Sequence, residues 1–228
     1  MGVHDSSVAQ QPAGNADETR NRLLATAERF FAEKGFDGTS VRDITTAAGC
    51  NVAAVNYHFG SKENLYREVF RHRLAALRDL RIRRIREAMS GDHPPTLEGV
   101  IQAFTMAFLE PLVEPGEGRL LVELWGREML EPRLPRELFR REMLNPVRDA
   151  LVGALLAVEP GLGPEAASMA VFSLVSQLVQ VVHLAHVGRR HGLTTQDPWN
   201  PENLDRMARH IVRFTAGGIR ALRSGGNP

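Results

Sequence analysis

Apolar residues recur at helical spacing along the whole chain, and no segment shows the alternation of a strand. A first helix is predicted to begin near Asp17 and to end at Gly35, where a glycine is suited to follow a helix. Its core face consists of Leu23, Ala27, Phe30 and Phe31. The pattern predicts an all-α fold.

Two short helices and a tight turn follow the first helix. Ser40 and Asp43 have a spacing like that of a capping box, which predicts that a helix begins at Val41. Gly49 ends this helix, and a third helix is predicted over 53–59, with Val55 as the apolar residue that locks it onto the second. Two short helices joined in this way are typical of a helix-turn-helix.

Ser61 is a good N-cap for a long fourth helix, from Lys62 to about Met89, in which leucines punctuate an arginine-rich surface. A Gly-Asp-His-Pro-Pro sequence then breaks the chain. The predicted organisation is a disordered leader (1–16), a helix-turn-helix domain (17–62), a connecting helix (63–90), a C-terminal helical domain for ligand binding and dimerisation (91–223) and a frayed tail (224–228).

The remaining residues predict five or six helices with wide apolar faces. One ends at Pro111, and another extends from Pro135 to about Val158 with a kink or break at Pro146. The segments 164–187 and 201–222 predict the last two helices. The first of these is nearly long enough to span a membrane, but serine, glutamine and histidine interrupt it, so we expect a buried or interface helix.

Charge is distributed unevenly, although the net charge is only +1. Residues 17–90 hold 14 Lys/Arg and 10 Asp/Glu, whereas residues 91–228 hold 14 and 16. This asymmetry suggests that the front of the chain meets a polyanion. A single cysteine, Cys50, fits a reducing compartment, and residues 1–16 carry no lysine, arginine or apolar run, so we expect a cytoplasmic protein. No catalytic constellation, metal-ligand cluster or phosphate loop stands out; neither enzymatic activity nor a cofactor is expected.

The third helix carries side chains suited to DNA. Ala53 and Ala54 are small enough for the start of the helix to approach a groove. Asn56 has the donor and acceptor needed to read adenine or to hold a phosphate, while Tyr57 and His58 suit phosphate and sugar contacts. Lys62, with the first amides of the fourth helix, forms a further phosphate site.

The segment TRNRLLATAERFFAEKGFDGTSVRDITTAAGCNVAAVNYHFGSKENLYREVF resembles the DNA-binding domain of TetR-family transcriptional regulators, and VNYHFGSKENLY resembles the CecR-like subgroup. The resemblance implies that the following residues contact DNA: Thr39, Ser40, Arg42, Ala53, Ala54, Asn56, Tyr57, His58 and Lys62. Asn56 stands where the family commonly has tyrosine. The resemblance also implies a homodimer, paired through 164–187 and 201–222, that binds a palindromic operator and is released by a small-molecule effector.

The C-terminal region offers candidate ligand contacts. Aromatic and methionine side chains of the kind that line adaptable pockets, and that also fill ordinary cores, are Phe104, Phe108, Trp125, Met129 and Met143. Gln177 and Gln180 lie in an otherwise apolar helix and need polar partners, either a ligand or the second subunit. A ligand-responsive repressor is the leading interpretation, and a regulator whose C-terminal domain binds a protein is the alternative. A cavity favours the first, and a filled core with an exposed apolar patch favours the second.

Overall fold

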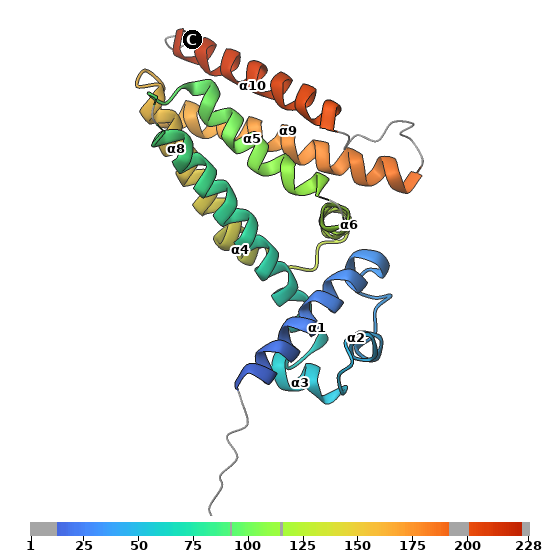
Figure 1. Ribbon diagram of the computed structural model, residues 1–228. Coiled ribbons are helices and arrows are strands. Elements are labelled where there is room, and N and C mark those ends of the chain that lie inside the picture. The colour runs from blue at the N-terminus through green and yellow to red at the C-terminus, as the bar shows by residue number, and fades with distance from the viewer. Residues whose placement is uncertain (1–12, 92, 115, 192–200, 225–228) are drawn as a thin grey trace, which may run out of the picture. The chain divides into compact units, whose positions relative to one another are not determined.

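The computed structural model describes residues 13–91, 93–114, 116–191 and 201–224 (Figure 1). Within these ranges the regular secondary structure is helical, and the all-α prediction is confirmed. The elements are α1 (Ala13–Lys34), α2 (Val41–Ala47), α3 (Ala53–Phe59), α4 (Lys62–Met89), α5 (Leu97–Val113), α6 (Glu117–Leu130), α7 (Arg136–Phe139), the π-helix η1 (Arg140–Leu144), α8 (Asn145–Val158), α9 (Pro164–His191) and α10 (Pro201–Ser224).

The chain divides into two compact units, Met1–Val69 and Phe70–Pro228. The division falls inside α4, so this helix begins in the first unit and continues through the second. The sequence instead set residues 63–90 apart as a connecting helix and placed a boundary near Gly91; those domain bounds stay a prediction.

The first unit is held together by an aromatic cluster between α1 and α4. The Phe31 ring meets the Tyr66 ring edge to face at 5.0 Å, and Phe36 meets Tyr66 at 5.2 Å. Such pairs add to the free energy gained by burying their apolar area. On the other side Val55 of α3 is fully buried, as expected for the residue that locks a helix-turn-helix together.

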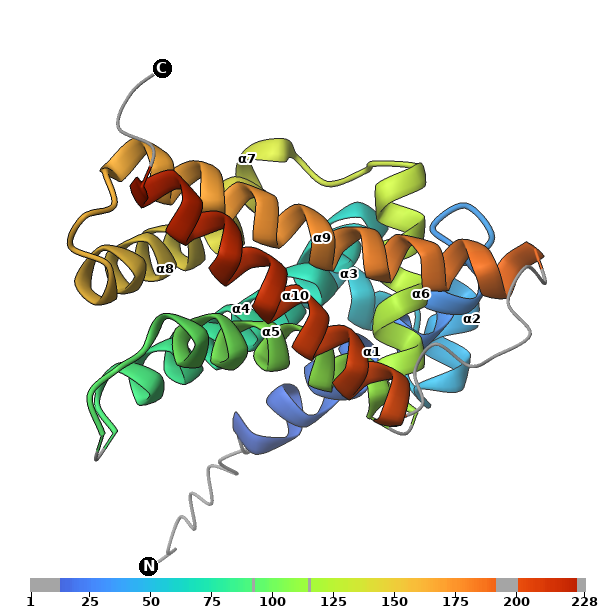
Figure 2. The ribbon, with the colours of Figure 1, turned by 90° about the horizontal axis from the view of Figure 1, so that it is seen from above.

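The second unit is a helical bundle with one continuous apolar core, built by residues from α4 to α10. α10 packs against both α5 and α9, and Figure 2 shows α10 (red) alongside α9 (orange). One sequence prediction was wrong here, because Pro111 lies inside α5 and the helix continues to Val113. Buried residues on both sides of this proline, Leu109 and Leu112, keep the last turn packed in the core.

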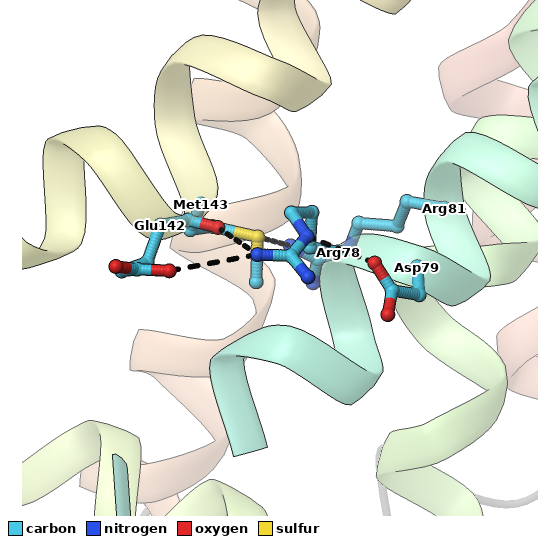
Figure 3. Close-up of polar contacts among 5 residues, drawn as sticks. All are labelled: Arg78, Asp79, Arg81, Glu142 and Met143. Carbon is cyan, nitrogen blue, oxygen red and sulfur yellow. Dashed lines mark hydrogen bonds and ion pairs between the residues drawn. The ribbon is translucent and has the colours of Figure 1, made fainter. Parts of the chain in front are cut away.

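The backbone changes its helical hydrogen bonding directly before Pro146, where the sequence predicts a kink or break. Pro146 stands at the start of α8, directly after the π-helix η1. A proline has no N–H, so the carbonyl of Glu142, four residues earlier, loses its usual partner. The Arg78 Nη1 atom of α4 donates to that carbonyl at 3.3 Å (Figure 3). The side chain of a neighbouring helix therefore takes over one backbone hydrogen bond.

Candidate functional site

The turn between α2 and α3 is built by its backbone and by one side chain. Gly49 has a φ of 64°, in the left-handed region that favours glycine. The Cys50 amide donates to the Thr45 carbonyl at 2.8 Å, and the Asn51 Oδ1 atom accepts from the Ala53 amide at 3.0 Å. Asn51 thus caps the start of α3, a role that the sequence analysis missed although asparagine is a common capping residue.

The start of α2 is fixed by the capping box that the sequence predicted. The Asp43 amide donates to Ser40 Oγ at 3.0 Å, and the Ser40 amide donates to Asp43 Oδ2 at 3.2 Å. Hydrogen bonds of the Ser40 side chain and backbone with the Asp43 carboxylate hold the pKa of Asp43 below its usual value. Ser40 and the neighbouring Arg42 are both exposed, so this helix start presents a hydroxyl and a guanidinium to solvent.

Thr39 differs from its neighbours, because it is buried. Its hydroxyl donates to the Gly35 carbonyl at 2.7 Å and lies 3.1 Å from the Phe30 carbonyl, near the end of α1. The side chain therefore fixes the connection between α1 and α2.

The solvent-facing side of α3 is formed by Ala53, Asn56 and Tyr57, whereas Ala54 and His58 are half-buried. Tyr57 is 81% exposed, which is unusual for an aromatic side chain in a folded unit. Its ring meets the His58 ring edge to face at 4.9 Å. The exposed asparagine and phenol, with the half-buried imidazole of His58, have the hydrogen-bonding groups needed to meet a polar partner.

Lys62, at the first position of α4, is oriented by an aromatic ring. Its Nζ atom lies 4.1 Å from the centre of the Phe36 ring, within the range of a cation–π contact. The preceding residue, Ser61, accepts from the Asn64 amide at 3.1 Å and so caps the helix as predicted. The ammonium group is therefore held near the start of a long helix.

The excess of Lys and Arg over Asp and Glu in residues 17–90 does not come from the first unit. The first unit, residues 1–69, holds 7 Lys/Arg and 9 Asp/Glu. The arginine excess lies in the later part of α4, within the second unit, where Arg73 pairs with Glu117, Arg78 with Glu142, and Arg84 with Glu110. Overall charge therefore does not mark the first unit as a polyanion-binding domain.

A cavity of about 550 Å³ lies inside the second unit. Residues from α4 to α9 and from η1 line it, most of them apolar. All five of the aromatic and methionine residues singled out in the sequence line this cavity: Phe104, Phe108, Trp125, Met129 and Met143. Its size is within the range of sites that hold small organic molecules.

The two glutamines do not take part in this cavity. The lining residues from α9 include Val175, Val179 and Val182, but neither Gln177 nor Gln180. Gln180 is exposed, and the Gln177 side chain lies 3.5 Å from Thr215 Oγ1 of α10. Both therefore belong to the α9–α10 side of the unit.

One charged residue in the cavity wall was missed by the sequence analysis. Arg81 of α4 is only 8% exposed, its guanidinium carbon lies 4.0 Å from the centre of the Phe108 ring, and its Nη1 atom lies 3.4 Å from Met143 Sδ (Figure 3). Burial lowers the pKa of Arg81 to about 9, so the group is still cationic at neutral pH. A signal existed in the sequence, because Arg81 stands four residues from both Leu77 and Ile85, on the apolar stripe of its helix.

Comparison with known sequences decides the family. Residues 23–69 match the family of bacterial regulatory proteins described as tetR, and residues 97–219 match the C-terminal domain of the HTH-type transcriptional dual regulator CecR. The second match alone covers more than half of the chain. The chain belongs to the TetR family. The resemblance to the CecR-like subgroup is thereby confirmed.

Individual relatives of this TetR-family regulator align over shorter segments. The transcriptional repressor NicS of Pseudomonas putida is 40% identical over 60 residues, which are 26% of this chain and 28% of that protein. The dual regulator CecR of Shigella flexneri is 44% identical over 50 residues, 22% of each chain. These alignments thus span less than a third of the relatives' own length.

A solved structure matches the fold over nearly the whole length. A transcriptional regulator from Saccharomonospora viridis, crystallised in complex with choline, superposes with a TM-score of 0.66 at 20% identity. The superposition covers 88% of this chain and 96% of that one. The TetR-family fold, with an N-terminal helix-turn-helix and a C-terminal helical domain, is therefore shared.

Proposed function

We propose that the protein is a cytoplasmic homodimeric repressor that binds a palindromic operator and is released from it by a small-molecule effector. The observation that carries this proposal is the pairing, within one TetR-family chain, of an exposed polar helix-turn-helix face with an apolar cavity of about 550 Å³. Each half of the proposal is open to its own test.

The proposed DNA contacts divide by chemistry. Ser40, Arg42 and Lys62 bind phosphates, because a hydroxyl and two cations position a protein on the backbone without reading bases. Ala53 and Ala54 allow α3 to enter the major groove, and Tyr57 and His58 hold the backbone at its edge. Asn56 reads a base edge. Thr39 contributes from the interior, by fixing the segment that presents Ser40.

The experiment that tests the DNA interface compares two alanine variants on the operator and on random DNA. Lys62→Ala weakens binding to both and makes it less dependent on salt, because one phosphate contact is lost. Asn56→Ala loses about tenfold or more on the operator and little on random DNA, which corresponds to one base contact. The measurement is fluorescence anisotropy over a salt series, with an operator obtained by genomic footprinting.

A matched control keeps this comparison sharp. Arg29→Ala removes one exposed positive charge from α1, outside the proposed interface, and leaves both affinities close to those of the wild type. Equal losses of Asn56→Ala on operator and random DNA would remove Asn56 from base reading and reassign it to a phosphate.

Dimerisation is supported by apolar side chains left exposed on α9 and α10. Phe172 on α9 is 67% exposed and Phe214 on α10 is 66% exposed. The stripe of α10 that contains Phe214 continues through the exposed Gly217 and Gly218, where an added Cβ would meet open space. Small residues beside large apolar ones suit close helix packing against a second copy.

The same faces account for the apolar character of α9. By length and composition this helix is able to cross a membrane, with a mean hydropathy of 1.6 over its most apolar part and 33% of that part buried. A second copy packed on α9 covers much of the part of this helix that is not buried within the subunit. We therefore propose that α9 is an interface helix.

A small-molecule effector is favoured over a protein partner by the cavity. A cavity in the second unit favours a small ligand, whereas a filled core would favour a protein partner, and this unit has a cavity of about 550 Å³. The choline complex of the structurally similar regulator from Saccharomonospora viridis supports a small ligand for this chain as well. A protein partner remains the second candidate, supported by the exposed apolar faces of α9 and α10.

The signal is proposed to pass along α4. Trp125 lines the cavity, and its ring meets the Phe70 ring of α4 edge to face at 6.1 Å and the Phe139 ring at 5.2 Å. An effector that displaces Trp125 thus pushes on the helix that continues into the DNA-binding unit. An effector that prefers the shifted position of α4 weakens operator binding by the same coupling free energy.

A further inference from the structure

The cavity of the second unit contains a positive charge that has no counterion among the described residues. Arg81 is more than nine-tenths buried, and its Nε atom has no hydrogen-bond partner among the described residues. A guanidinium has five N–H donors, and the hydrogen bond recorded for this one goes to a thioether sulfur, which is a weak acceptor. The Phe108 ring beneath it offers an attractive face but no acceptor atom.

Among the described residues, the cavity wall contains no carboxylate that would neutralise this charge. Of the described lining residues, the ionisable ones are arginines: Arg81, Arg140 and Arg148. Arg140 is exposed and pairs with Glu137 at 2.8 Å, and Arg148 is exposed and pairs with Asp149 at 2.7 Å. Of these three arginines, Arg81 is the one that is buried and has no ion pair to a described residue.

A neighbouring arginine of α4 has a structural role, because its donors are paired. Arg78, one helical turn earlier, donates to the Glu142 carbonyl and lies within ion-pair distance of Asp79 and Glu142 (Figure 3). Its donors link α4 to η1. Arg81 makes no such link and points its charge at the sulfur and ring atoms of the cavity wall.

An uncompensated buried charge is costly, since a charge in an apolar site loses its hydration. Binding an anion recovers that loss, because a charge-assisted hydrogen bond in a dry site is stronger than one in water. A neutral ligand leaves the charge unpaired, and a cation adds repulsion. The preference for an anion therefore follows from the wall itself.

We propose that the effector is an apolar organic anion, whose carboxylate, sulfonate or phosphate group binds Arg81 while its apolar body packs against Phe104, Phe108 and Trp125. This inference rests on the proposed function, because it names the chemical class of ligand for the same cavity. Arg81 is the residue that determines ligand specificity.

Two fluorescent probes that differ by one anionic group test the inference. Anilinonaphthalene sulfonate and phenylnaphthylamine share their aromatic body, and the second lacks the sulfonate. Titrated into the full-length wild type, the sulfonate binds about tenfold tighter or more than the neutral probe, as one charge-assisted hydrogen bond predicts. In Arg81→Met this difference disappears, while the affinity of the neutral probe stays the same.

A charge-matched variant serves as the control. Arg83→Met removes an equal charge from the same helix, but Arg83 is exposed and lies outside the described cavity wall. It retains the tenfold preference for the sulfonate. An equal loss of that preference in Arg83→Met would assign it to long-range charge and overturn the role of Arg81.

The outcomes separate this inference from the proposed function. If neither probe binds the wild type, the effector half of the proposed function fails. If both bind with equal affinity, the cavity takes ligands and the anion preference alone is wrong.

Thermal unfolding adds a readout independent of ligand: Arg81→Met raises the melting temperature of the ligand-free protein, because it removes an unpaired buried charge. A lower melting temperature would instead show that Arg81 stabilises the fold.

Discussion

At the scale of single residues, α6 and α9 approach each other closely at Gly126. A Cβ atom added at Gly126 would lie 2.1 Å from the Cγ atom of His186, which is fully buried with its Nδ1 atom 3.2 Å from Glu123 Oε2. Only glycine lets the imidazole approach so closely. The substitution Gly126→Ala therefore forces the helices apart and destabilises the protein by about 1–3 kcal/mol, measured by urea unfolding.

The control for this variant lies on α8. An added Cβ at Gly153 meets open space within an exposed part of the helix. Gly153→Ala is expected to stabilise the protein by about 0.5–1 kcal/mol, because alanine favours the helix over glycine. If Gly126→Ala were as well tolerated as Gly153→Ala, the close contact with His186 would carry no energetic weight.

At the scale of elements, α9 and α10 provide the proposed dimer interface. Phe214→Asp places a charge in its centre and is expected to shift the protein from dimer to monomer, measured by analytical ultracentrifugation at micromolar concentration. Leu130→Asp is the matched control, because Leu130 is 50% exposed at the end of α6 and outside that interface. A dimer that survives Phe214→Asp unchanged would place the interface elsewhere.

At the scale of the whole molecule, the cavity and the helix-turn-helix are separate sites that share α4. Allosteric release predicts that rising effector lowers operator affinity to a plateau, about 5–150-fold below the starting value. Direct competition for the DNA face would instead lower it without limit. Anisotropy titrations of labelled operator at several effector concentrations distinguish the two, and the effector is found by screening compounds for operator release.

Much of the first unit follows from local sequence. The glycine turn at Gly49, the capping box of Ser40 and the core position of Val55 depend on residues close together in the chain, and the structure has all three where the sequence predicted them. Their geometry is set by backbone conformation and short-range hydrogen bonds, which hardly depend on the rest of the fold. The α-helical class and the TetR-family resemblance rest on the same local information.

Contacts between distant segments add what local sequence does not show. Thr39 is a predicted DNA contact, and its hydroxyl also meets carbonyls near the end of α1. At Pro146, where the sequence predicts a kink or break, an arginine of α4 donates to the carbonyl that lacks its usual partner. In both cases the deciding partner lies on another element.

Arg81 shows most plainly which features follow from local sequence and which depend on tertiary packing. In the sequence it belongs to an arginine-rich helix surface, and its spacing from Leu77 and Ile85 is the same as that of Arg78 from Leu74 and Ile82. Whether a guanidinium is hydrated or buried depends on which helices pack over it. Local spacing therefore determined that this chain is helical and has a helix-turn-helix, because those features need only near neighbours. Only the packing of α4 against its partners decided that the cavity contains an unpaired charge.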